Sequence, residues 1–222
     1  MSGRRRTPLP FDDPRYEALQ AVELPIVLLV GGATGTGKSS VATEIAHLLG
    51  ITRVTSTDFI RQTIRAFFSE RSMPSVHHSS FEGDPLLVAF LDQTRNVLVG
   101  VDAALDRALA EGWSMVLEGV HLVPGLMPAE IEGALVVHTV LAVESEEVHR
   151  TRFHVRDQLT GGVRPMHKYL DQLDEIRQIQ EYLVERAEKH RVPVIESSDV
   201  DGATTAVLEL VLAAAVRAEV LV

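Results

Sequence analysis

Five short runs of apolar, largely β-branched residues recur along the chain, separated by longer segments with helical periodicity. The runs cover residues 25–30, 52–55, 114–117, 134–142 and 192–195. Short strands that are apolar almost throughout are typical of a parallel sheet buried on both faces. The pattern therefore predicts an α/β, doubly wound fold in which a five-stranded parallel sheet lies between two layers of helices.

The segments between these runs carry apolar residues at three- and four-residue spacing, which predicts helices with one buried face. The predicted helices cover residues 41–49, 98–109, 169–187 and about 203–217. Two segments interrupt this alternation: residues 69–85, rich in Ser, His, Pro and Gly, and residues 157–168, which contain Gly161-Gly162. Long loops in a compact domain are commonly functional or mobile. We expect one to grip a substrate and the other to form part of a lid at about residues 150–168.

The length and the two ends of the chain suggest one domain with a short extension. A chain of 222 residues suits a single domain, expected here at residues 21–222 after a polar tail at residues 1–20. The basic start, Arg4 to Arg6, is followed by Pro8 and Asp12 instead of an apolar stretch, which argues against a signal peptide. No apolar run is long enough for a membrane span. We expect a cytoplasmic protein without a membrane partner.

Composition narrows the classes of function. Apolar residues make up 45% and charged residues 23% of the chain, which is ordinary for a folded enzyme. The net charge of −10 argues against a nucleic-acid partner, because nucleic-acid binding requires a basic surface. The absence of cysteine excludes disulfides, thiolate metal sites and thiol catalysis. The sequence does not determine the oligomeric state, and a homodimer stays open.

A phosphate-binding loop lies between the first predicted strand and the first predicted helix. Residues 32–39 read Gly-Ala-Thr-Gly-Thr-Gly-Lys-Ser, the P-loop pattern whose backbone N–H groups cradle phosphates. Lys38 would reach the β- and γ-phosphates and Ser39 would coordinate Mg²⁺. The predicted nucleotide-binding residues are Gly32, Thr34, Gly35, Thr36, Gly37, Lys38, Ser39 and Ser40. This motif predicts a P-loop NTPase fold, a three-layer αβα sandwich, with ATP and Mg²⁺ as cofactors.

Acidic and basic side chains follow the second and third predicted strands, at the edge where ligands bind in parallel sheets. Asp58 is a candidate for holding Mg²⁺ or accepting the proton of an acceptor hydroxyl, although it could also cap the next helix. Arg61 and Arg65, one helical turn apart, suit a phosphate or carboxylate, and a solvated face is the alternative. Glu118 ends a strand that resembles Walker B, so it could serve the metal or the hydroxyl, and His121 follows close by. Ser39, Asp58 and Glu118 together form the predicted metal site.

Arginines in the predicted lid and hydroxyls in residues 69–85 complete the candidate site. Arg152 and Arg156 are predicted to neutralise charge on the transferred phosphoryl group, and Arg164 to contact the substrate. Surface pairing with Glu146, Glu147 and Asp157 is the alternative for these arginines. Ser79 and Ser80 are predicted to contact the substrate. Adjacent His77 and His78 do not suggest a metal site, because no correctly spaced partner follows.

Several of these segments together resemble 2-phosphoglycerate kinase and its bacterial relatives. The resemblance rests on residues 31–39, Ser56-Thr57-Asp58 with Arg61, Ser79-Ser80, and residues 117–124, and it extends over about residues 25–198. It implies transfer of a phosphoryl group from ATP to 2-phosphoglycerate, giving 2,3-bisphosphoglycerate. It also implies that Lys38 and Ser39 bind nucleotide and Mg²⁺, that Asp58 and Glu118 manage metal and hydroxyl, and that Arg61 and Ser79-Ser80 face the phosphoglycerate.

Three other functions stay open from the residues alone. One is a kinase for a different small hydroxyl compound, such as a sugar acid or a nucleoside. Another is a nucleotide switch, against which the chain lacks an Asn-Lys-x-Asp guanine signature. The third is a non-catalytic regulator that binds nucleotide or phosphoglycerate, although Lys38, Ser39, Asp58 and Glu118 are all present.

Overall fold

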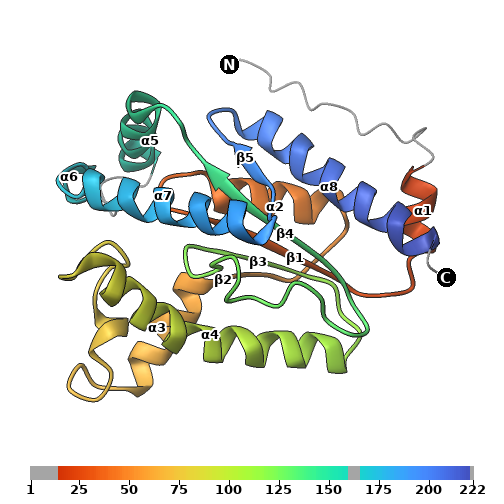
Figure 1. Ribbon diagram of the computed structural model, residues 1–222, viewed down its shortest axis with the longest axis horizontal. Helices are drawn as coiled ribbons and strands as arrows, with labels where there is room; N and C mark the ends of the chain where they lie inside the picture. The colour runs from red at the N-terminus through yellow and green to blue at the C-terminus, as the bar shows by residue number, and fades with distance from the viewer. Residues whose placement is uncertain (1–14, 160–165, 221–222) are drawn as a thin grey trace.

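The core of the fold is a five-stranded parallel sheet. The computed structural model describes residues 15–159 and 166–220. The strands are β1 (Ile26–Gly32), β2 (Val54–Ser56), β3 (Met115–Gly119), β4 (Leu135–Ala142) and β5 (Val194–Glu196). They run parallel in the order β2-β3-β1-β4-β5 (Figure 1). The predicted five-stranded parallel α/β fold is confirmed.

Four of the five strands, β1, β2, β3 and β5, end one or two residues later than the apolar runs indicate. β1 continues through Gly31, which pairs with Gly119 of β3, and Val30 pairs with Glu118. A strand ladder is made by backbone groups, so it continues through glycine and glutamate when neighbouring strands lie on both sides. This register places Glu118 directly beside the end of β1, where the phosphate-binding loop begins.

One face of the sheet is covered by α2 (Lys38–Leu48) and α8 (Val200–Val220), and α1 (Arg15–Ala21) packs against α8. Leu28 and Val30 of β1 point to this side, where they join the apolar cluster that includes Val207 and Leu212 of α8. Val27 and Leu29 alternate with them and point to the opposite face. This alternation is the two-residue period of a strand buried on both sides.

The opposite face carries α4 (Leu86–Ala110) and α7 (Leu173–His190), and α3 (Thr57–Phe67) packs against α4 (Figure 1). The short helix η1 (Pro74–His77) contacts both α3 and α4. Near the carboxyl ends of the strands lie α5 (Glu146–Leu159) and α6 (Met166–Leu170). Two helical layers therefore enclose the sheet, as the sequence predicts. Within the described part of the chain, no helix combines the length and apolar character that a bilayer crossing requires.

Three segments differ from the expectations. Residues 15–20, which belong to the predicted polar tail, form most of α1 (Arg15–Ala21), because Tyr16 and Leu19 pack against the apolar cluster under α8. The helix expected at residues 98–109 begins at Leu86, since its early apolar residues contact α7 and the segment after β3. The helix expected at residues 169–187 is divided between α6 and α7.

Two valines on α4 provide a test of the packing. Val97 is fully buried in the cluster under β1 and β3, whereas Val99 is 70% exposed. We expect Val97→Ala to lower the free energy of unfolding by about 2 kcal/mol, because it removes buried methyl groups and leaves a cavity. Val99→Ala, the matched control, should change it by less than about 0.5 kcal/mol. Urea unfolding monitored by circular dichroism measures both, and equal midpoints would contradict this placement of α4.

Candidate active site

The loop between β1 and α2 has a conformation that suits glycine at two positions. Gly35 and Gly37 have φ angles of 88° and 86°, in the left-handed region that L side chains rarely adopt. A Cβ atom on Gly35 would also lie 2.7 Å from both His149 Nε2 and Phe153 Cζ of α5. Conformation and close packing both require glycine here, so α5 rests directly on the phosphate-binding loop.

Four consecutive carbonyl groups of this loop, those of residues 33–36, accept hydrogen bonds from side chains. The donors are Lys38 Nζ to Ala33 at 2.6 Å, His149 Nε2 to Thr34 at 2.7 Å, Arg152 Nη1 to Gly35 at 3.3 Å, and Ser197 Oγ to Thr36 at 2.7 Å. A trans peptide directs its N–H opposite to its C=O. The carbonyls of residues 34–36, which bond to α5 and to Ser197, are turned into the protein and leave the N–H side of the loop for an anion.

Lys38 lies at the start of α2 and is only 9% exposed. Burial lowers the pKa of Lys38 from 10.5 to about 8, while the charges of Glu118 and Asp58 oppose this shift and that of Arg156 adds to it. These charged groups, which come from β3, α3 and α5, therefore act on one ammonium group. A polyanion bound to the loop would favour the charged form of Lys38.

Ser39 and Glu118 form a hydroxyl–carboxylate pair beside the loop. Ser39 Oγ donates to Glu118 Oε1 at 3.0 Å, an approach that the pairing of β3 with β1 makes possible. Oxygen ligands of this kind suit Mg²⁺. The described residues contain no cluster of three His, Cys, Asp or Glu side chains that could hold a metal alone. The pair therefore fits an ion that takes its remaining ligands from phosphate and water.

Asp58 is available for chemistry because another residue caps α3. Ser56 Oγ accepts from the Phe59 N–H at 3.0 Å, so Ser56 caps α3, and the capping role that was the alternative for Asp58 is not observed. The Asp58 carboxylate is 65% exposed and pairs with Arg61 at 2.8 Å. Arg61 is buried, and its Nη1 also donates to the carbonyls of Val76 at 2.8 Å and His78 at 2.9 Å. It therefore orients Asp58 and residues 76–78 from behind.

The arginines of α5 differ in their surroundings. Arg152 donates to the carbonyls of Gly35 and Ser197, and so ties α5 to the phosphate-binding loop. The guanidinium of Arg156 lies 4.2 Å from the centre of the Tyr169 ring of α6. Arg150 instead makes a surface pair with Glu146 at 2.9 Å. Arg164 lies outside the described residues.

The remaining predicted substrate residues are divided between the surface and the interior. Arg65 is exposed on α3, and Ser79 and Ser80 are half-buried between η1 and α4. The Ser79 N–H donates to Glu82 Oε2 at 2.8 Å. His121, in contrast, is 1% exposed, and its ring contacts Thr57 and Gln93 in the interior. The structure therefore gathers Lys38, Ser39, Asp58, Glu118 and Arg61 around one place and leaves Arg65 at its margin.

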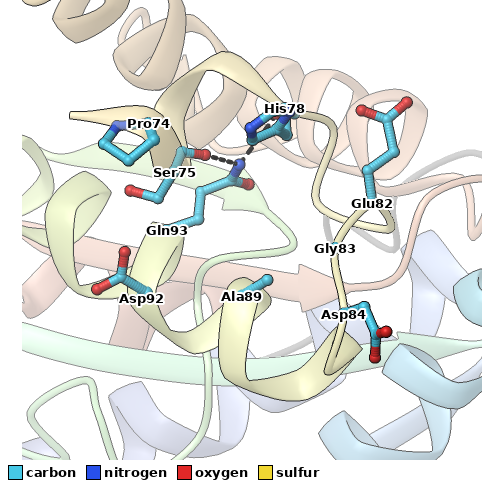
Figure 2. A pocket seen from close by; sticks show the side chains of 9 residues that line it. All are labelled: Pro74, Ser75, His78, Glu82, Gly83, Asp84, Ala89, Asp92 and Gln93. Carbon is cyan, nitrogen blue, oxygen red and sulfur yellow. Dashed lines mark hydrogen bonds between the residues drawn. The ribbon is translucent and has the colours of Figure 1, made fainter. Parts of the chain in front are cut away.

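A pocket of about 280 Å³ lies next to residues 79–80, between η1 and the start of α4 (Figure 2). Glu82, Asp84 and Asp92 are among its lining residues, which include no Lys or Arg. Carboxylates repel a phosphate or a carboxylate at close range. This pocket is therefore unsuited to an anionic ligand, whereas the phosphate-binding loop and its arginines are suited to one.

Curated proteins with similar sequences are 2-phosphoglycerate kinases. Those of Methanopyrus kandleri and Methanothermobacter thermautotrophicus are 40% and 38% identical over 84% and 83% of this chain. The 2-phosphoglycerate kinase of Thermococcus kodakarensis is 36% identical over 87% of this chain and 68% of its own length. The chain belongs to the 2-phosphoglycerate kinase family.

The chain spans less than two thirds of the length of the first two of these relatives, 62% and 65% respectively. No protein-family model matches it. Among solved structures, a shikimate kinase from Acinetobacter baumannii in complex with shikimate aligns with 88% of this chain and 97% of its own at 19% identity. Its TM-score of 0.49 makes that likeness too distant to bear on substrate or mechanism.

In this member of the family, two buried residues at the site, His149 and Gln93, are not among the residues predicted from sequence motifs. His149 lies on α5, far in sequence from the loop whose Thr34 carbonyl it binds. Gln93 lies midway along α4 and contacts His121 and two carbonyls near η1. The available hint was a polar residue within the apolar stripe made by Phe90, Val97 and Val101. A polar residue on a buried helix face needs partners, but sequence does not name them.

The lowered pKa of Lys38 predicts that this residue, although suited to binding phosphate, lowers the stability of the nucleotide-free fold. Below about pH 8 the fold must hold a buried ammonium, and this cost disappears as pH rises toward 10.5, where the unfolded chain also loses the proton. We expect Lys38→Met to raise the free energy of unfolding without nucleotide by about 1–3 kcal/mol at pH 7. The Ala33 carbonyl keeps a donor in Thr36 Oγ1 at 3.0 Å, so it is not left unpaired.

Urea unfolding of both proteins at pH 7 and at pH 10 measures this difference. The gain should shrink at pH 10, because the wild-type protein then no longer carries the full buried charge. A variant that is less stable than the wild type at pH 7 would contradict the prediction.

Proposed function

We propose that this chain is an ATP-dependent kinase that phosphorylates 2-phosphoglycerate, or a closely similar anionic hydroxy-acid, to give 2,3-bisphosphoglycerate. The observation that carries the proposal is the phosphate-binding loop with Lys38 and Ser39 set beside Glu118. Asp58 lies at the end of the neighbouring strand. The relatives named 2-phosphoglycerate kinase support the choice of acceptor.

On the donor side, the N–H groups of the loop and Lys38 would bind the β- and γ-phosphates of ATP. Ser39 and Glu118 would hold Mg²⁺, whereas Asp58 lies nearby and is not proposed as a metal ligand. When bound, Mg²⁺ supplies neutralisation of charge on the phosphate oxygens. Arg152 keeps the loop in shape through Gly35, and Arg156 is proposed to balance charge on the transferred group.

The chemical step is an in-line displacement at the γ-phosphorus. The hydroxyl oxygen of the acceptor forms a bond to phosphorus as the bond to the β–γ bridging oxygen breaks, and ADP leaves with that electron pair. The hydroxyl proton passes to a carboxylate. We assign this role to Asp58, because it is exposed and oriented by Arg61, whereas Glu118 Oε1 is engaged with Ser39.

The acceptor's own charges require cations and donors on the same side as Asp58. Arg65, Arg164 and the Ser79-Ser80 hydroxyls are the proposed contacts. Arg61 would act from behind, because its Nη1 donors are taken by the Val76 and His78 carbonyls. The acidic pocket lined by Glu82, Asp84 and Asp92 would exclude the acceptor by repulsion.

A coupled ADP-release assay with Mg·ATP tests the proposed function. We expect 2-phosphoglycerate to stimulate ADP release by the wild-type chain, and Lys38→Met to remove that stimulation by at least a factor of about 100. A panel of acceptors that includes gluconate, glycerate and a nucleoside serves as the control. Stimulation by one of these compounds in place of 2-phosphoglycerate would overturn the acceptor assignment, and no stimulation by any of them would overturn the kinase proposal.

The different roles proposed for Asp58 and Glu118 give a separate prediction. We expect Glu118→Gln to lower kcat by roughly 10- to 1,000-fold, with an increased requirement for Mg²⁺, because the amide is a poorer metal ligand. Asp58→Asn should lower kcat comparably without changing the Mg²⁺ concentration needed for half-maximal rate. Mg²⁺ titrations of the initial rate distinguish the two variants. An unchanged Mg²⁺ requirement in Glu118→Gln would contradict this assignment.

A further inference from the structure

A chain of hydrogen bonds between buried side chains crosses from α3 to α4. Thr57 Oγ1 lies 2.8 Å from His121 Nδ1, and His121 Nε2 lies 2.8 Å from Gln93 Oε1. All three residues are buried, at 0%, 1% and 2% exposed. Buried polar groups in such a chain contribute to stability only when each one is hydrogen-bonded. The chain therefore favours one arrangement of these three side chains.

The far end of this chain holds residues 75–78. Gln93 Nε2 donates to the carbonyl of Ser75 at 2.6 Å and to that of His78 at 3.0 Å, as Figure 2 shows. The His78 carbonyl also accepts from Arg61 Nη1 at 2.9 Å. Two side chains on different helices therefore hold the same short segment, which leads directly into Ser79 and Ser80.

The direction of every bond in the chain follows from its ends. The carbonyls of Ser75 and His78 can only accept, so the amide nitrogen of Gln93 must face them and its oxygen must face His121. His121 then carries its proton on Nε2. Burial lowers the pKa of His121 to about 3, with Arg61 and Lys38 adding to the effect and Asp58 opposing it. The imidazole is therefore neutral, and Nδ1 accepts from the Thr57 hydroxyl.

The near end of the chain lies between the two carboxylates of the site. Thr57 precedes Asp58, and it packs against the backbone of Gly119, which follows Glu118. Gly119 has a φ of 156°, and a Cβ atom there would overlap the Thr57 side chain. A shift of Thr57 would therefore move both carboxylates.

We propose that Gln93, acting through His121 and Thr57, is a positioning residue. It holds the acceptor segment (residues 75–80) in a fixed position relative to Asp58 and Glu118. The inference rests on the function proposed above and adds the residue that couples acceptor binding to the catalytic carboxylates. Gln93 acts in this proposal through its bonds to the acceptor segment and to His121. Its loss lets the acceptor segment move, and a misplacement of about 1 Å is enough to lower turnover by up to two orders of magnitude.

The test replaces Gln93 by Met, which keeps the length and removes every polar contact. We expect the acceptor KM to rise by roughly tenfold or more and kcat to fall, with the Kd for ADP, measured by calorimetry, within about twofold of the wild type. Hydrogen–deuterium exchange should become faster in residues 69–85. The matched control is Thr94→Val, since Thr94 is equally buried on the same helix but bonds only the Phe90 carbonyl of α4.

Substitution of Thr57 tests the other end of the chain and covers the case in which Gln93→Met does not fold. Thr57→Ser keeps the hydroxyl and should retain the wild-type acceptor KM within about threefold, whereas Thr57→Val should reproduce the defect of Gln93→Met. If Thr57→Val shows the defect and Thr57→Ser does not, the lost hydroxyl is the cause, because a general loss of packing would not be corrected by the hydroxyl alone.

The outcomes separate this inference from the proposed function. Wild-type acceptor KM and wild-type exchange of residues 69–85 in Gln93→Met would overturn the inference and leave the kinase proposal standing. An equal loss of ADP affinity would also overturn it, because the effect would then be general. If the wild-type chain shows no acceptor-stimulated turnover, the proposed function fails, and with it the role in acceptor positioning.

Discussion

The candidate site depends on one constraint, which is that the carbonyl groups of residues 33–36 all accept hydrogen bonds from side chains. Only Lys38 among the donors belongs to the loop's own helix, whereas His149 and Arg152 come from α5 and Ser197 follows β5. Because each carbonyl is occupied, the opposite N–H face of the loop keeps its orientation without a ligand. Binding an anion then requires little rearrangement, which is the physical meaning of preorganisation.

The same arrangement places charged groups in a partly desolvated part of the protein. Lys38 is buried beside Glu118 and within the fields of Asp58 and Arg156, so its ammonium is costly to hold until a polyanion is present. The buried Lys38 ammonium thus lowers the stability of the ligand-free fold, and a bound triphosphate would restore it. α5 links this donor side to α6 through the stacked rings of His149, Phe153 and Tyr169, whose centroids are 5.3 Å and 5.1 Å apart.

The side proposed to bind the acceptor is organised by a different principle. Residues 75–78 are held through their carbonyls by Arg61 and Gln93, so an apparent loop is fixed by two buried side chains. The pocket beside it is lined by Glu82, Asp84 and Asp92, whose charges disfavour an anion there. Arg61, which the motif suggests as a direct ligand, serves in the structure as a support for Asp58 and this segment.

The sequence by itself determined the alternation of parallel strands with helices, the phosphate-binding loop and the acids that follow or end β2 and β3, because these features depend on local periodicity and short motifs. Contacts between distant segments required the tertiary structure. His149 meets Thr34, and Gln93 meets His121, only after α4 and α5 pack against the sheet. Their partners lie far along the chain, and a single sequence records the polarity of a residue but not which carbonyl it will face. Folding therefore decided how Asp58, Glu118 and Arg61 divide their roles, since burial and hydrogen bonding are properties of the packed molecule.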